Sequence, residues 1–288
     1  MNEYSLAKVQ EDNNMRWDIE QLPKEYREHI IFKNLDSIKD FYDFLSYSSF
    51  SFLPEGLPGT FPNIDTYIFS SIKGTIDSVC LLLNKAHIND AFAIVRKYFD
   101  EILLDIYFTV YRQEQKRKYP EVFLLTAERV KKWMEENFKM PKYGDVIKYF
   151  ERSESYKSLF CFFDFEKRFR RIRDILDDNM HMNSYQWMIT NDNEIHNQYR
   201  TRYLNLLDTC INDLFLFHFA SCLYLNPQYC MASDYVDYLD LGQTPPEGSE
   251  NWIANIAQET FNKIIKPHKE LALYLKKNVY LDIECDYE

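Results

Sequence analysis

Two neighbouring segments of the chain carry apolar residues at the spacing of an α-helix. The first begins after Asn63, a residue type that caps helix N-termini, and its apolar positions are Ile68, Ile72, Ile76, Val79 and Leu83. After a break at residues 87–89, the second carries Ala91, Val95, Tyr98, Ile102 and Ile106. On its other side Arg96 precedes Asp100 by four residues, the spacing of a helix salt bridge. We therefore predict an antiparallel helical hairpin, the elementary unit of a bundle.

Further helical patterns lie on both sides of this hairpin. We expect a short helix over residues 36–47, a charged linker at 112–118 and an amphipathic helix over 121–138. Short helical pieces over 143–160 and a helix over 163–180 follow. The longest helix is expected over 192–225, and Ser249 caps a last helix that Pro267 kinks or breaks. Proline and glycine mark two irregular segments, 54–62 and 227–248. Because strand-type alternation is nearly absent, the predicted fold class is all-α, a multi-helix bundle.

The positions of these patterns also suggest a division of the chain. Residues 1–62 form an N-terminal extension with a short helix and a loop, and residues 63–226 form the bundle core. Residues 227–288 begin with an irregular loop and continue with C-terminal helices that we expect to pack on the core.

Composition narrows the classes of function. Only 6 of 288 residues are glycine, which disfavours the glycine-rich loops of dinucleotide-binding folds and P-loop enzymes. The 34 Lys and Arg against 45 Asp and Glu give a net charge of −11. Proteins that bind duplex DNA through its phosphates are normally basic, so we predict no duplex DNA binding, although a local basic groove is compatible with this charge.

Cysteine usage and hydropathy indicate the compartment. The six cysteines contain no CxxC pair, so we expect neither a zinc framework nor disulfides, and Cys210 and Cys222 are interpreted as small apolar residues within a helix. Residues 1–20 lack the apolar region of a signal peptide, and the most apolar stretch, 214–225, is too short to span a bilayer. We predict a cytoplasmic protein without a membrane segment.

Aromatic residues are abundant, at 17% of the chain. Most of them are expected in the core, because tyrosine and phenylalanine recur at helical spacing. Surface tyrosines such as Tyr235 and Tyr238 have a second interpretation, as a protein interface or a stacking platform for single-stranded nucleic acid.

The strongest candidate for chemistry is the segment from Lys167 to His181, which is first basic and then acidic. On a helix, Arg170, Asp174 and His181 share one face, together with Asp177 or Asp178. Such a stripe suits metal-independent RNA cleavage. His181 would act as general acid or base, Arg173 or Arg170 would hold the phosphate, and Asp174 would orient the imidazole, with no cofactor or metal. The alternative is ordinary helix salt bridges followed by a histidine at the helix C-terminus.

Other polar groups are secondary candidates. Arg168, Arg171, His196 and Arg200 are predicted to contact substrate, and His196 would approach His181 if its helix folds back; an exposed polar first turn is the alternative. The aspartates at 234, 237 and 240 suit either a cation or a solvated acidic segment, but they lack the pattern of a calcium loop. The histidines at 29, 87, 218 and 268 are isolated in the sequence.

Residues 84–101, NKAHINDAFAIVRKYFDE, resemble the second core helix of bacterial HEPN-like families. The later Leu176-Asp177, followed by His181, is similar to their Leu-Ser/Asp-x-x-x-His element, and the resemblance extends over about residues 64–225. It implies an all-α bundle, frequently dimeric. The active branch of these families is a metal-independent endoribonuclease of toxin–antitoxin and abortive-infection systems.

The chain departs from the motif of that active branch. Seven residues separate Arg173 from His181, one more than the motif allows. This departure favours a non-catalytic helical binding or regulatory module of a bacterial defence or toxin–antitoxin assembly, with a homodimer or another protein as partner. The alternative is a HEPN-like endoribonuclease that acts on RNA through a composite site across a dimer.

Overall fold

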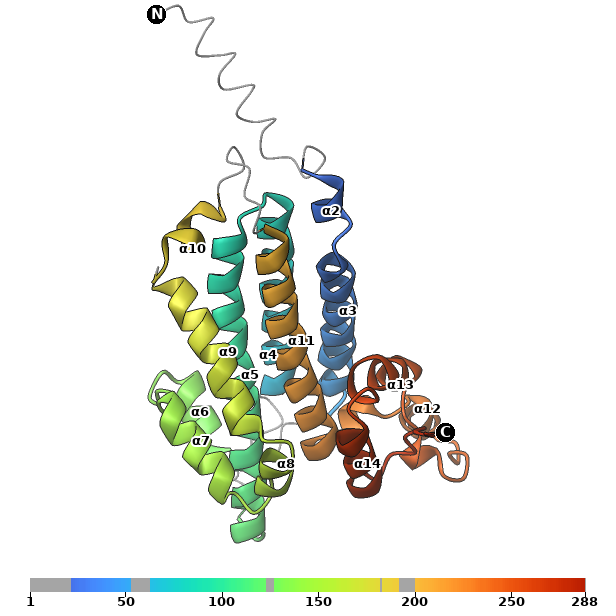
Figure 1. The fold of residues 1–288 in the computed structure, drawn as a ribbon. Coiled ribbons are helices and arrows are strands. Elements are labelled where there is room, and N and C mark those ends of the chain that lie inside the picture. The colour runs from blue at the N-terminus through green and yellow to red at the C-terminus, as the bar shows by residue number, and fades with distance from the viewer. Residues whose placement is uncertain (1–21, 53–62, 123–126, 182, 192–199, 288) are drawn as a thin grey trace, which may run out of the picture.

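The computed structural model describes residues 22–52, 63–122, 127–181, 183–191 and 200–287. Within these ranges the regular structure is helical throughout, apart from one isolated bridge between Met231 and Ile253. The predicted all-α class is therefore confirmed. Figure 1 shows long helices side by side, with the short helices α2 and α10 near the upper end of the bundle and the other short helices near its lower end.

Five helices form the body of the bundle. They are α3 (Ile30–Phe50), α4 (Ile64–Asn84), α5 (Ile88–Lys118), α9 (Phe165–Met180) and α11 (Arg200–Leu225). Helix α5 packs against α4, α9 and α11, and α3 packs against α4 and α11. The predicted hairpin is the α4–α5 pair, which is joined through Ala86 in a left-handed conformation with φ of 56°.

The start of α4 follows the sequence prediction. The side-chain oxygen of Asn63 accepts a hydrogen bond from the backbone N–H of Asp65 at 3.2 Å, so Asn63 is the N-cap. The apolar stripe predicted for this helix, from Ile68 to Leu83, is buried. Burial of this stripe supplies the stability that a helix of this length lacks in isolation.

The end of α5 and the length of the helix that follows it differ from the prediction. The predicted linker 112–118 is instead the end of α5, whose basic last turn faces the negative end of the helix dipole. Helix α6 (Glu128–Met134) is shorter than the predicted 121–138, of which residues 123–126 lie outside the described chain. It ends where Glu136 adopts a positive φ of 59°, which stops helical hydrogen bonding.

The remaining helices before α11 are short. They are α2 (Lys24–Arg27), α7 (Tyr143–Arg152), α8 (Lys157–Phe162) and α10 (Tyr185–Ile189). Helices α7 and α8 confirm the short pieces predicted over 143–160. The longest described helix is α5 with 31 residues, and α11 has 26 described residues; residues 192–199 of the segment predicted to form the longest helix lie outside the described chain, so that expectation stays a prediction.

The C-terminal region is more ordered than expected. The segment 227–248, predicted to be irregular, contains the 3₁₀ turn η3 (Pro227–Cys230) and α12 (Asp234–Asp240). Ser249 does not cap the last helix. It lies in a second 3₁₀ turn, η4 (Ser249–Asn251), and its hydroxyl donates a hydrogen bond to the carbonyl of Pro246 at 2.6 Å.

Helix α13 (Asn255–Thr260) begins only after Ala254 and continues into a π-helical turn, η5 (Phe261–Ile265). The predicted break at Pro267 is confirmed, because α14 (Lys269–Asn278) begins after it.

One hydrophobic core connects α3, α4, α5, α9 and α11 with the shorter helices α2, α6, α7, α8, α13 and α14. Helix α3, which the predicted division assigned to the N-terminal extension, contributes the fully buried Phe41 and Tyr42 to it. Many aromatic rings meet edge to face, as between Phe169 and Phe217, whose centroids are 4.9 Å apart. The expectation that most aromatic residues are core residues is confirmed.

Helix α11 is the described helix that is long and apolar enough to cross a membrane by length and composition. Most of its apolar window is buried inside the bundle, however, including Leu214, Phe217 and Leu223. A helix that is apolar on all sides fits the centre of a helical domain equally well. Its hydropathy is therefore explained by core packing.

Candidate functional site

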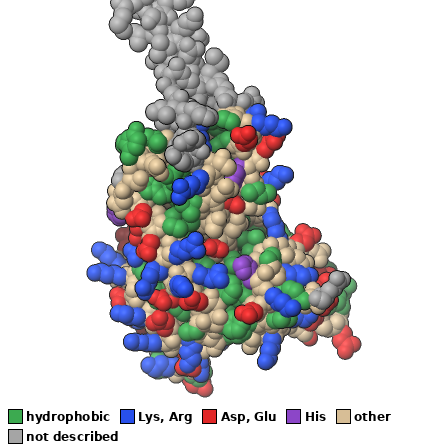
Figure 2. Space-filling view, viewed as in Figure 1, with side chains coloured by type: hydrophobic (Ala, Val, Ile, Leu, Met, Phe, Trp, Pro, Cys, Tyr) green, Lys and Arg blue, Asp and Glu red, His purple; other side chains and the backbone are tan. Residues whose placement is uncertain are grey.

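Helix α9 lies on the surface with one apolar face turned inward. The buried residues Phe165, Phe169, Ile172, Leu176 and Asn179 recur at helical spacing and pack toward α5 and α11. The predicted charged residues therefore lie on its outer side and its two flanks. In Figure 2, Lys and Arg side chains gather on the face formed by α9 and α7, with acidic groups among them.

The order of charges along α9 is opposite to the order that the helix dipole favours. After Glu166, residues 167–173 carry Lys167, Arg168, Arg170, Arg171 and Arg173, whereas the following turns carry Asp174, Asp177 and Asp178. Basic groups near a helix N-terminus and acidic groups near a C-terminus each cost about 0.3–1 kcal/mol at low ionic strength. This order of charges is not explained by the stability of the helix.

The predicted catalytic residues lie along this helix but do not form one cluster. Arg170 is largely exposed and forms an ion pair with Glu166, one turn earlier. Asp174 is exposed, and His181 is exposed at the C-cap of α9. Within the described chain, no hydrogen bond or ion pair joins the His181 imidazole to Arg170, Arg173 or Asp174.

The predicted substrate contacts have different surroundings. Arg168 lies over the ring of Phe163, with 4.1 Å between the guanidinium carbon and the ring centroid, and Arg171 is exposed. Arg200 is buried in the first turn of α11. His196 lies outside the described residues, so its predicted approach to His181 stays a prediction.

Asp177 joins α9 to α5. It accepts a hydrogen bond from Arg96 Nε at 2.7 Å, and its second oxygen lies 3.2 Å from an Nη atom of Arg173. Arg96 also forms the predicted ion pair with Asp100. The two segments that carry the family resemblance, around Arg96 and around Asp177, are thus in contact.

A groove opens beside this cluster, between α5, α7 and α9. Its cavity volume is about 580 Å³, and its lining includes Arg96, Lys142, Tyr143 and Arg173. The guanidinium of Arg173 lies 4.7 Å from the centroid of the Tyr143 ring. We call this cavity the α9 groove.

Two buried donors of the α9 groove lack partners. The hydroxyl of Tyr143 and the Nε of Arg173 are inaccessible to solvent and make no hydrogen bond. Burial raises the pKa of Tyr143 to about 12, against the opposing effect of Arg170 and Arg173, so the phenol keeps its proton at neutral pH. Both atoms are donors, and a ligand in the groove would reach them only after the two side chains turn toward it.

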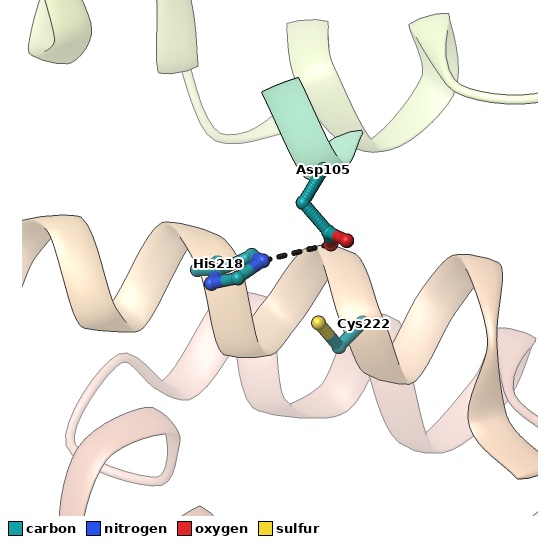
Figure 3. Close-up of side chains that lie close together, drawn as sticks. All are labelled: Asp105, His218 and Cys222. Carbon is teal, nitrogen blue, oxygen red and sulfur yellow. Dashed lines mark hydrogen bonds and ion pairs between the residues drawn. The ribbon is translucent and has the colours of Figure 1, made fainter. Parts of the chain in front are cut away.

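A second polar cluster lies in the core, where α5 meets α11. His218 Nε2 lies 2.9 Å from Asp105 Oδ2, and Cys222 lies one turn farther along α11 (Figure 3). His218 Nδ1 is 2.7 Å from the hydroxyl of Tyr42, which in turn lies 2.7 Å from the hydroxyl of Tyr98. We call Asp105, His218 and Cys222 the buried triad.

Burial dominates the electrostatics of the buried triad. It raises the pKa of Asp105, against the hydrogen bond and the attraction from His218. Burial also raises the pKa of the Cys222 thiol well above its ordinary value. The second carboxylate oxygen of Asp105, Oδ1, is buried and has no hydrogen-bond partner.

The buried triad is not among the predicted sites. His218 was interpreted as isolated, but the structure surrounds it with Asp105 and Tyr42. Two signals were present: His218 and Cys222 are four residues apart on one helix, and Asp105 interrupts the apolar run from Ile102 to Ile106. The α12 aspartates, weighed as cation ligands, form no such convergent group within the described ranges.

A third cluster fixes the start of α4. The Asp65 carboxylate accepts two hydrogen bonds from an Nη atom of Arg112, at 2.6 and 2.7 Å, and a third from the hydroxyl of Tyr229 at 2.8 Å. All three residues are buried. These contacts tie α4, α5 and η3 together, so we interpret this cluster as structural.

Comparisons with known proteins identify no relative of this chain. No family model matches the chain, and neither a curated protein nor a solved structure matches it. The function of the chain therefore has to be argued from its own side chains.

Proposed function

We propose that the protein is a non-catalytic helical module that binds single-stranded RNA along α9, as the regulatory component of a bacterial defence or toxin–antitoxin assembly. The observation that carries the RNA-binding part is the α9 groove, with its two unpartnered donors beside the basic half of α9. The defence setting is supported by the resemblance of residues 84–101 to HEPN-like families.

Local charge supports a phosphate-bearing ligand. The first nine residues of α9 carry five cationic residues, two of them in its first turn, in a chain whose net charge is −11. A bound anion would turn this unfavourable arrangement into a favourable one. The acidic remainder of the surface would repel an extended duplex, whereas a flexible single strand can follow one short basic path.

The donors of the α9 groove suit a phosphate oxygen. Arg173 Nε and the Tyr143 hydroxyl have no hydrogen-bond partner in the protein, and an anionic acceptor would use both once their side chains turn toward the groove. Beyond the C-terminal end of α9, the α10 residue Tyr185 is 70% exposed and offers a ring on which a base can stack. Phosphate binding and stacking together are typical of single-strand recognition.

The positions of the charged groups favour binding over cleavage. Eight residues of helix place Arg173 and His181 about 12 Å apart along the axis, at about 1.5 Å per residue. Arg173 is held toward Asp177 and Tyr143. A single phosphate is therefore not within easy reach of both the guanidinium and the imidazole of one chain.

Fluorescence anisotropy with a labelled single-stranded RNA tests the proposal. Reversing two exposed charges, in the double variant Arg170→Glu and Arg171→Glu, is expected to weaken binding by about tenfold or more and to flatten its salt dependence. The control reverses two exposed lysines on α2 and α3, Lys24→Glu and Lys33→Glu, with the same change in net charge. Equal loss in both double variants, or no binding by the wild type, would contradict the proposal.

The same RNA, separated on a denaturing gel, tests the non-catalytic part. We expect intact RNA. Cleavage that disappears in His181→Ala would instead support the endoribonuclease alternative.

We also propose a cytoplasmic location and a homodimer or another protein as partner. The six cysteines are unpaired, as expected in a reducing compartment. Light scattering of the purified chain tests the dimer, and a monomer at micromolar concentration would exclude it.

A further inference from the structure

We propose that Asp105, His218 and Cys222 form a binding site for a divalent transition metal, best suited to Zn²⁺, that links α5 to α11. This inference is independent of the RNA-binding function, because the buried triad lies in the core rather than on α9.

The geometry brings one ligand atom from each side chain together. A carboxylate oxygen of Asp105, a ring nitrogen of His218 and the sulfur of Cys222 all lie within 4.8 Å of one another. His218 and Cys222 are four residues apart, so both project from the same face of α11, and Asp105 reaches them from α5 (Figure 3). Zinc accepts this mixture of oxygen, nitrogen and sulfur ligands.

The unpartnered oxygen of Asp105 is the independent sign of a ligand. Asp105 is only 3% exposed, and its Oδ1 makes no hydrogen bond. A buried carboxylate oxygen without a partner is costly, and proteins normally pair such groups or use them to coordinate a metal. A metal bound by Asp105 would remove this cost.

A metal-binding histidine usually donates a hydrogen bond from its other ring nitrogen, and the surroundings of His218 offer an acceptor for it. Its Nδ1 lies 2.7 Å from the hydroxyl of Tyr42. With the metal on Nε2, the proton sits on Nδ1 and is donated to the Tyr42 oxygen, which fixes the tautomer and the orientation of the ring. Tyr42 would then donate to Tyr98, its other neighbour at 2.7 Å.

Charge balance also favours a dication. On binding, the Cys222 thiol loses its proton to solvent and forms a metal–sulfur bond, while the Asp105 carboxylate exchanges its hydrogen bond to His218 for a metal–oxygen bond. One thiolate and one carboxylate neutralise a dication, so the core holds no net charge at this site. No electron is transferred. The soft sulfur ligand disfavours Mg²⁺ and Ca²⁺.

The burial of the site indicates a structural role. Each of the three residues is less than 5% exposed, so a bound metal would be shielded from substrates. Its effect would be to hold α5 against α11, and metal binding to the folded state alone would raise thermal stability.

Metal analysis of the full-length chain tests the site. Protein expressed in zinc-supplemented medium is expected to contain about one zinc ion per chain. After chelation and refolding with Co²⁺, a thiolate-to-cobalt charge-transfer band is expected. The Cys222→Ser and Asp105→Asn variants should lose the charge-transfer band or weaken binding by about tenfold or more.

The matched control is Cys210→Ser, which replaces a buried cysteine three turns earlier on the same helix. It should keep the metal and the cobalt spectrum, and circular dichroism confirms that each variant folds. Zinc should raise the Tm of the wild type and of Cys210→Ser, but not that of Cys222→Ser. Wild-type protein without bound metal, or an unchanged cobalt spectrum in Cys222→Ser, would overturn the proposal.

Discussion

Arg96 of α5 donates a hydrogen bond from Nε to Oδ1 of Asp177 on α9 at 2.7 Å, although 81 positions separate them in the chain. Asp177 also pairs with Arg173. Both side chains of the α5–α9 contact are shielded, with Arg96 15% and Asp177 28% exposed, so this pair is screened less than a surface salt bridge. It fixes one edge of the α9 groove.

Removing this shared carboxylate is expected to destabilise the bundle. Asp177→Ala leaves two guanidinium groups without their common acceptor, and we expect a loss of about 1–3 kcal/mol in the free energy of unfolding. Asp174→Ala, one turn earlier and exposed, is the control and should change stability by no more than about 0.5 kcal/mol. Urea denaturation measures both, and equal effects would show that the contact contributes nothing.

Breaking the buried Arg112–Asp65 pair is expected to lower the free energy of unfolding by more than the loss of Asp177 does. Arg112→Met leaves the Asp65 carboxylate buried with no opposite charge, which is expected to cost about 3–5 kcal/mol. Replacing both residues, in Arg112→Met with Asp65→Leu, should recover much of this loss, because no charge then stays buried. Chemical denaturation of the two variants checks this order. A double variant less stable than the single one would contradict it.

Loss of the Tyr42 hydroxyl and loss of the Tyr98 hydroxyl should cost different amounts of stability, although the two hydroxyls are hydrogen-bonded to each other. Tyr42→Phe removes the contact to His218 Nδ1 as well as that to Tyr98, and should cost about 1–3 kcal/mol. Tyr98→Phe removes only the contact to Tyr42 and should cost less. Thermal unfolding of the two variants tests this order, and an equal cost would show that the Tyr42–His218 bond adds no stability.

Glu114 should contribute a pH-dependent part of the stability. Burial raises the pKa of its carboxyl, but hydrogen bonds from Ser155 N at 2.7 Å and Ser153 Oγ at 2.8 Å outweigh this effect, so the pKa is lowered overall. A lowered pKa means that the folded state favours the charged form. The contribution is therefore complete above the unfolded value of about 4.3 and disappears as the pH falls through the folded value.

The variant Glu114→Gln tests this dependence. Its stability deficit relative to wild type should be largest at neutral pH and shrink below about pH 4. The exposed Glu259→Gln is the control and should show no such trend. Urea midpoints measured between acid and neutral pH give the comparison, and a deficit that does not change with pH would contradict the assignment.

Several features were predictable because they depend on local sequence. The Asn63 cap and the apolar stripe of α4 follow from backbone chemistry within one helix. The break at Pro267 is equally local. The ends of α5 and α6 were not predictable, because the residues of 112–118 are polar and their helical state depends on the buried turns before them. The Ser249 prediction failed because Ser249 lies in the turn η4, whereas α13 begins only after Ala254.

The sequence by itself determined the helical class, the α4–α5 hairpin and the burial of the aromatic residues. These features follow from a period of 3.6 residues and from the removal of apolar surface from water. Only the tertiary structure decided which polar groups meet. Asp105 joins His218 across 113 positions, and Arg96 joins Asp177 across 81. Such pairs depend on how helices pack, and the spacing along one chain carries no information about that packing.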